Sequence, residues 1–96
     1  MTYAEIEGIV IGQLAALLID NRPNRTWQVS AKTPLLAEGA PIDSFDLVNL
    51  VVAIEERLER EGHTIEILDE HATTGLDSPF RTVASLARHV HWKVAP

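Results

Sequence analysis

The chain has 96 residues, no cysteine and a formal net charge of −6, so we expect one small domain over residues 1–96. The missing thiol excludes disulfides, thiolate metal sites and a cysteine nucleophile. The acidic balance disfavours nucleic acid and anionic membranes and favours basic partners. The apolar run from Ile9 to Ile19 is too short to span a bilayer, and the start lacks the basic region of a signal peptide. We therefore expect a cytoplasmic protein without membrane insertion.

The first predicted element is a helix from about Thr2 to Asp20, which ends before Pro23 because proline cannot donate to the helical ladder. One face of this helix is apolar at the spacing of helical turns, through Tyr3, Ile6, Val10, Leu14 and Leu17. Gly8 and Gly12 form a GxxxG pattern. In this short helix we interpret the pattern as close packing against another helix of the same domain.

Residues 21–43 have no sustained period and contain Pro23, Pro34, Gly39 and Pro41. They predict one long loop, with a turn of helix near Leu35 and with Trp27, Leu35 and Leu36 packed beneath it. Loops of this length are often functional in compact domains.

A second helix is predicted from about Ser44 to Glu61, with Gly62 as its stop. Its core stripe follows helical spacing through Leu47, Leu50, Val51, Ile54 and Leu58. A second apolar set, rotated away from that stripe, comprises Phe45, Val48 and Val52. Such a set either lies inside the domain or faces a partner.

After this helix, residues 69–72 predict a brief helix, and Thr82 is a candidate N-cap for the last one. The last helix has a buried stripe of Val83, Leu86, Ala87 and Val90. The chain therefore predicts an all-α fold, a small four-helix bundle of three main helices and one short helix, with a long loop between the first and second helices.

The stretch PIDSFDLVNL places Ser44 between Asp43 and Asp46 at the head of the second helix. Helix capping explains such a cluster if Asp43 or Ser44 accepts from the first backbone N–H groups while Asp46 complements the helix dipole. A serine at this position also suits a phosphoryl-linked group, because the phosphate would meet free N–H groups. The sequence leaves both interpretations open.

The wider stretch TPLLAEGAPIDSFDLVNLVVAIEERL resembles the acyl carrier proteins, whose mark is a D-S-L-type motif at the head of the second helix after a long loop. The resemblance extends weakly over nearly the whole chain. It implies that Ser44 carries 4′-phosphopantetheine, transferred from coenzyme A by a phosphopantetheinyl transferase. It also implies a monomeric, non-catalytic carrier of acyl groups for fatty-acid, polyketide or related biosynthesis.

The resemblance further implies roles for the residues around the serine. Asp43 would help the transferase and its metal ion to engage the site, and Asp46 would cap the helix. Acyl-loading and acyl-processing enzymes with basic patches would dock on a surface made of Phe45, Asp46, Val48, Val52, Glu55 and Glu56. In that surface, Glu55 and Glu56 would steer the basic partners.

Some residues depart from the family pattern. Phe45 stands where leucine is most common, Asn49 stands where an acid is common, and the EREGHTIEI segment is longer than usual. These differences favour a specialised carrier over the housekeeping fatty-acid protein. A peptidyl or aminoacyl carrier is the less favoured variant, because glycines usually precede the serine in those proteins.

Two other classes of function remain as alternatives. A non-enzymatic acidic helical adaptor would need the apolar set on the second helix but no serine beside it. A hydrolase built on Ser44 with His63 or His71 lacks a GxSxG elbow. His89 and His91 lie two positions apart on a helix and so face different directions, which disfavours a metal site.

Overall fold

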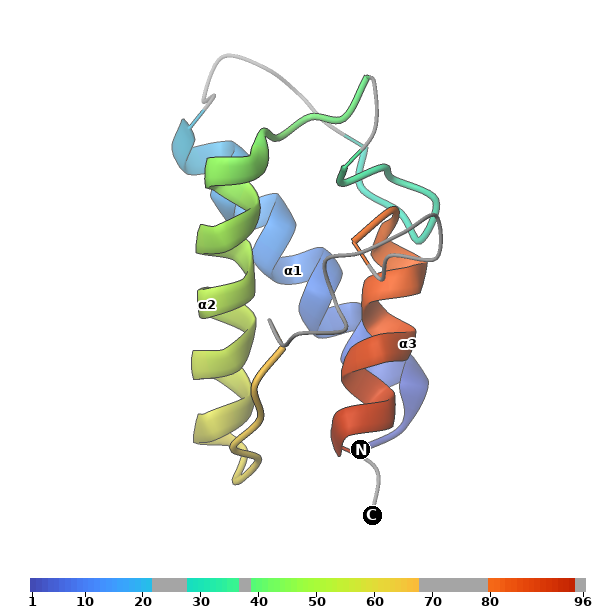
Figure 1. Cartoon of the computed structure of the whole chain (residues 1–96), viewed down its shortest axis with the longest axis vertical. Helices are drawn as coiled ribbons and strands as arrows, with labels where there is room; N and C mark the ends of the chain where they lie inside the picture. Colours follow the sequence, from blue (N-terminus) through green and yellow to red (C-terminus); the bar gives the residue numbers. More distant parts are fainter. Residues whose placement is uncertain (22–27, 37–38, 68–79, 95–96) are drawn as a thin grey trace.

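The computed structural model describes residues 1–21, 28–36, 39–67 and 80–94. These residues form three helices, α1 (Tyr3–Asn21), α2 (Ser44–Arg60) and α3 (Val83–Val94), and no strand. Helix α1 crosses behind the other two and packs against both (Figure 1). The prediction of an all-α fold is confirmed for the described residues, while the brief helix expected at residues 69–72 lies outside them.

The predicted apolar stripes of α2 and α3 form most of the core. All nine of their side chains are buried: Leu47, Leu50, Val51, Ile54, Leu58, Val83, Leu86, Ala87 and Val90. On α1 the buried face runs through Ile6, Val10 and Leu14 as predicted, but it continues through Leu18 instead of Leu17. Each step of four residues turns the helix by about 40° beyond one full turn, because a turn holds 3.6 residues, so the line of buried side chains winds gradually around α1.

The GxxxG face of α1 does not pack against another described helix. Gly8 and Gly12 are exposed, and a Cβ atom placed on either would meet no atom within 4 Å. The predicted close helix contact there is therefore wrong. Helix α1 is apolar on most sides, so the side with the larger side chains is buried, because it removes more apolar area from water.

The segment before α2 pairs with the segment before α3. Pro34 forms an isolated antiparallel bridge with Thr82, and the Leu35 N–H donates to the Arg81 carbonyl at 2.9 Å. The predicted turn of helix near Leu35 is therefore wrong, because its backbone bonds across to another segment. Leu35 is buried in the core as expected, whereas Leu36 is half exposed. Trp27 and parts of the predicted loop, residues 22–27 and 37–38, lie outside the described residues.

The first turn of α3 is capped and covered. Thr82 is the N-cap as predicted, since its Oγ1 accepts from the Ser85 N–H at 3.1 Å. The Thr82 N–H in turn donates to the Ser85 Oγ. Carbonyls of the long connection accept from the next two donors: Val83 donates to Thr33 and Ala84 donates to Ala31. The first three N–H groups of α3 therefore all have partners.

Helix α2 ends as predicted, and the chain then turns toward α3. Gly62 has φ +91°, a left-handed conformation that suits glycine at a helix end. Five residues later, Ile67 is fully buried between the two helices. Its N–H donates to Glu55 Oε2 on α2 at 2.8 Å, and its carbonyl oxygen lies 3.2 Å from His89 Nε2 on α3. Helices α2 and α3 have no Cα atoms within 8 Å of each other, so this described residue links them.

Candidate functional site

Asp43 caps α2. Its backbone is extended, with φ −100° and ψ −177°, and its Oδ1 accepts from the Asp46 N–H at 2.8 Å. Its carbonyl accepts the first helical bond, from the Leu47 N–H at 3.0 Å. Of the two capping residues that the sequence allows, the structure therefore selects Asp43 and leaves Ser44 without that role.

Ser44 is the first residue of α2, and it is exposed. Its hydroxyl makes no hydrogen bond with any residue that the structure describes, and the backbone N–H groups of Ser44 and Phe45 likewise have no acceptor in that part of the chain. An exposed serine hydroxyl and two backbone N–H groups without a described acceptor thus lie together at the positive end of a 17-residue helix. This arrangement suits a phosphate ester.

Asp46 does not lie where the resemblance implies. Only 9% of its surface is exposed, so its carboxylate contributes little to an exposed acidic face. It also does not supply the cap, because it takes part through its backbone N–H. The physical reason is its position one turn before Leu50, which places it beside the core stripe of α2. Its negative charge still lies in the first turn, where the helix dipole favours it.

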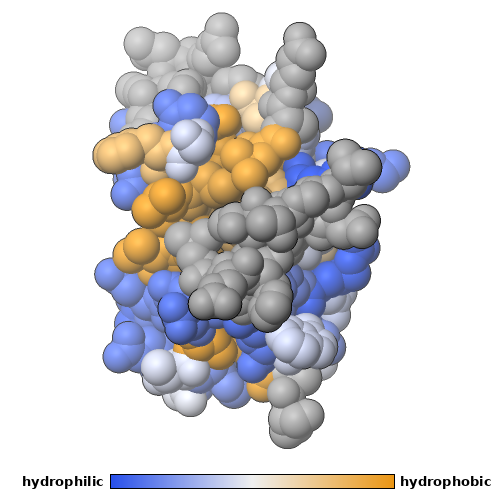
Figure 2. All heavy atoms as spheres, viewed as in Figure 1, coloured by the Kyte–Doolittle hydropathy of each residue, from blue (hydrophilic) through white to orange (hydrophobic). Residues whose placement is uncertain are grey.

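The second apolar set of α2 is exposed and is called the α2 strip below. Phe45 is 75% exposed, Val48 48% and Val52 44%. The strip begins beside Ser44 and continues along the N-terminal half of the helix. Figure 2 shows apolar atoms gathered over the upper, N-terminal half of α2, whereas its lower half is hydrophilic. The structure therefore excludes the interpretation in which this set is buried inside the domain.

The two glutamates expected to steer partners differ in their surroundings. Glu56 is exposed, whereas Glu55 is half-buried and accepts the Ile67 N–H. One oxygen of the Glu55 carboxylate is therefore used for a hydrogen bond within the fold. The sequence did not predict this bond, because its partner lies 12 positions away. Glu59, one turn beyond Glu55, is also exposed. The exposed acidic edge of α2 thus consists of Glu56 and Glu59.

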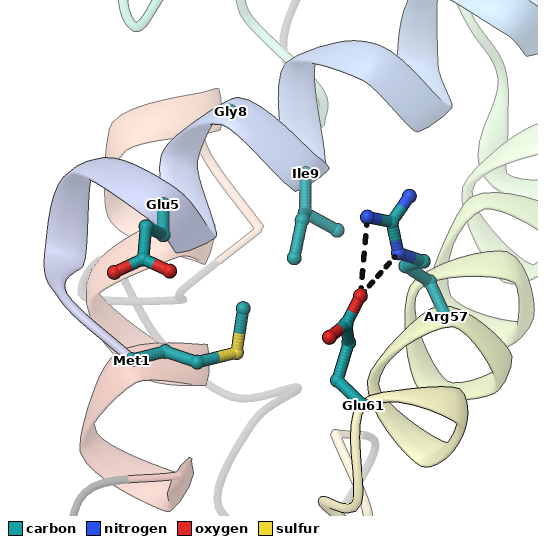
Figure 3. Close-up of a pocket in the computed structure, with 6 residues that line it drawn as sticks. All are labelled: Met1, Glu5, Gly8, Ile9, Arg57 and Glu61. Carbon is teal, nitrogen blue, oxygen red and sulfur yellow. Dashed lines mark hydrogen bonds and ion pairs between the residues drawn. The ribbon is translucent and has the colours of Figure 1, made fainter.

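A separate pocket of about 340 Å³ lies at the opposite end of α2 (Figure 3). It is lined by Met1, Glu5, Gly8, Ile9, Arg57 and Glu61. An ion pair between Arg57 and Glu61, 3.2 Å long, borders it. A 17-residue helix is about 25 Å long, so this pocket is remote from Ser44.

His89 and His91 take part in packing contacts. His89 bonds to the Ile67 carbonyl and stacks on Trp92, while the His91 ring meets the edge of Tyr3. These two histidines face different neighbours, as their spacing predicts. Among the described residues no three potential metal ligands come together. His71 lies outside the described residues.

The chain matches no family model, no curated protein sequence and no solved structure at a significant level. In the described part of the chain, no helix combines the length and apolar character needed to cross a membrane.

Proposed function

We propose that the protein is an acyl carrier whose Ser44 holds a 4′-phosphopantetheine arm. The observation that carries this proposal is the exposed hydroxyl of Ser44, which makes no hydrogen bond with the described residues although it begins a helix. Asp43 provides the cap in its place. A serine that is not needed for the helix end is available for modification.

The surroundings of Ser44 fit the charge of the arm. The serine oxygen would form the new P–O bond as the nucleotide part of coenzyme A leaves. The resulting phosphodiester anion would lie next to the N–H groups of Ser44 and Phe45, at the positive end of the helix dipole. Attached there, the arm supplies the thiol that holds an acyl group as a thioester.

The neighbouring surface fits the exchange of partners. The α2 strip offers a small apolar contact, and Glu56 and Glu59 border its far end. A small apolar contact with acidic residues at its edge favours fast and salt-sensitive association with basic enzymes. We assign docking of the transferase and of the acyl-processing enzymes to this surface.

The direct test is to incubate the protein with coenzyme A, magnesium and a broad-specificity phosphopantetheinyl transferase, and to measure the intact mass. We expect the parent protein and a Ser30→Ala control to gain one phosphopantetheinyl group, and a Ser44→Ala variant to gain none. Ser30 is a suitable control because it is also an exposed serine. Since the chain has no cysteine, a thiol reagent should label only the modified protein.

A non-covalent adaptor is the second candidate, because the α2 strip would suit it equally well. The same experiment separates the two functions. If the mass does not change under conditions that modify a known carrier, the carrier proposal fails and the adaptor remains.

A further inference from the structure

Helix α3 carries no acidic residue, although the protein as a whole has a formal net charge of −6. Residues 80–94 contain three arginines or lysines and no acidic residue. On the side of α3 away from the core, Arg88 is exposed and Trp92 is 73% exposed. The Trp92 ring stacks on His89 with a centroid distance of 6.5 Å and an interplanar angle of 22°. This contact holds a large apolar surface in place, one turn beyond a positive charge.

The outer face of α2 carries an apolar residue followed by a negative charge, whereas the outer face of α3 carries a positive charge followed by an apolar residue. Along α2, exposed Val52 is followed one turn later by exposed Glu56. Along α3, exposed Arg88 is followed one turn later by Trp92. If the two helices lie antiparallel, Arg88 meets Glu56 while Trp92 meets Val52. At this register two residue pairs are complementary, one in charge and one in apolar character.

We propose that the outer face of α3 in one molecule binds the outer face of α2 in a second copy of this chain. A contact of a few helical turns buries less than about 1,200 Å², the range of weak and transient interfaces. Dilute protein is then monomeric, and association grows with concentration. Because the two faces differ, the contact is heterologous and each complex keeps one free face of each kind.

The contact would cover Val52 and Glu56, which we also assign to enzyme docking. Self-association would therefore compete with docking, and this consequence rests on the proposed function. The contact itself does not depend on Ser44 or its modification. A failure of the self-association test would leave the mass test of Ser44 unaffected, and the reverse is also true.

Sedimentation velocity of the full chain from about 10 μM to about 1 mM tests the proposal. We expect the weight-average sedimentation coefficient to rise with concentration, and to rise less at about 0.5 M salt than at about 0.1 M. Arg88→Glu and Glu56→Arg should each remove the rise. A 1:1 mixture of the two variants should restore it, because each variant retains the face that the other has lost.

Lys32→Glu is the matched control, since it changes the charge by the same amount at an exposed residue outside both faces. It should associate like the parent protein, and Trp92→Ala should associate less. Circular dichroism of each variant checks that the helices are retained. A parent protein that stays monomeric throughout the range overturns the proposal. Association that Arg88→Glu and Trp92→Ala leave unchanged also overturns it, because the contact then lies on another surface.

Discussion

The first turns of α2 and α3 both begin at a capping side chain, but their surroundings differ. At α3, Thr82 and Ser85 bond to each other, and the carbonyls of Ala31 and Thr33 cover the next donors. At α2, Asp43 binds one donor, and Ser44 is left exposed. The hydroxyl of Ser85 is therefore hydrogen-bonded into a helix start, whereas the hydroxyl of Ser44 has no hydrogen-bond partner among the described residues. The hydrogen bonds of the hydroxyl distinguish the two cases, whereas residue type does not.

The two phenylalanines of the chain give the largest expected contrast between these helix starts. Phe80 is 1% exposed just before α3, whereas Phe45 is 75% exposed in the first turn of α2. Phe80→Ala should lower the free energy of unfolding by about 3–5 kcal/mol. Phe45→Ala should change it by less than about 0.5 kcal/mol. Urea unfolding followed by circular dichroism measures both.

If Phe80→Ala fails to fold, Phe80→Leu provides a milder test with an expected loss of about 1–2 kcal/mol. Equal losses at Phe45 and Phe80 would contradict the difference in burial between the two helix starts.

The two N-caps should contribute similar amounts. Asp43→Ala and Thr82→Ala should each lower the free energy of unfolding by about 1 kcal/mol, because each leaves a first-turn N–H without its acceptor.

Asp43→Asn keeps an acceptor oxygen and should cost only a few tenths of a kcal/mol. The same variant removes the charge beside Ser44, so the rate of phosphopantetheinylation should fall although the fold is retained. An unchanged rate would remove Asp43 from the engagement of the transferase.

Ser85 and Ser44 should have opposite roles. Ser85 should matter for stability and not for modification, and Ser44 should matter for modification and not for stability. Ser85→Ala should cost about 0.5–1.5 kcal/mol, because the Ser85 hydroxyl accepts from the Thr82 N–H and donates to the Thr82 carbonyl. Ser44→Ala should change the free energy of unfolding by less than about 0.5 kcal/mol. Thermal and urea unfolding of both variants check the difference. A large loss for Ser44→Ala would show that its hydroxyl supports the helix start.

The smallest expected effect on the free energy of unfolding concerns Tyr3, which contacts the first turn of α3, and it should be seen at high pH. The Tyr3 hydroxyl donates to the Ala84 carbonyl at 3.4 Å, in the first turn of α3. Burial raises the pKa of Tyr3, the Glu7 carboxylate raises it further, and Arg88 opposes them. The folded state therefore favours the neutral phenol. The neutral Tyr3 phenol contributes fully to stability below the ordinary tyrosine pKa of about 10. This contribution is lost as the pH rises through the higher pKa that Tyr3 has in the folded state.

Tyr3→Phe should flatten this alkaline decline in the free energy of unfolding between about pH 9 and pH 11. Unfolding measured at several pH values for both proteins provides the comparison. An equally steep decline in Tyr3→Phe would assign the pH dependence to another group.

The sequence predicted the elements whose signals are local. The ends of α2 follow from Asp43 and Gly62, and the α3 stripe and its Thr82 cap follow from spacing and residue type. Exposure of the α2 strip was one of two outcomes that the pattern allowed. On α1 the pattern predicted the buried side only in part. A helix that is apolar on most sides does not indicate which side is buried.

The features that the sequence could not predict depend on residues far apart in the chain. Glu55 looked like a surface charge, yet it binds the Ile67 N–H. The backbone at Leu35 bonds to Arg81, which no local pattern encodes. The resemblance to the acyl carrier proteins implies an exposed Asp46 in the docking surface, whereas its position in the turn places it beside the core. Burial of a charged residue overrode the usual preference there.

The pairing of the long connection with the start of α3 also bears on the order of folding. Thr33 and Val83 lie 50 positions apart, and their hydrogen bond can form only after a large loop has closed. Nucleation of α3 is therefore coupled to placement of the segment that leads to Ser44. In native-state hydrogen exchange, the amides of Leu35, Leu36, Val83 and Ala84 should open together as one cooperative unit. The long connection therefore takes part in a long-range closure of the domain and also leads to its candidate site.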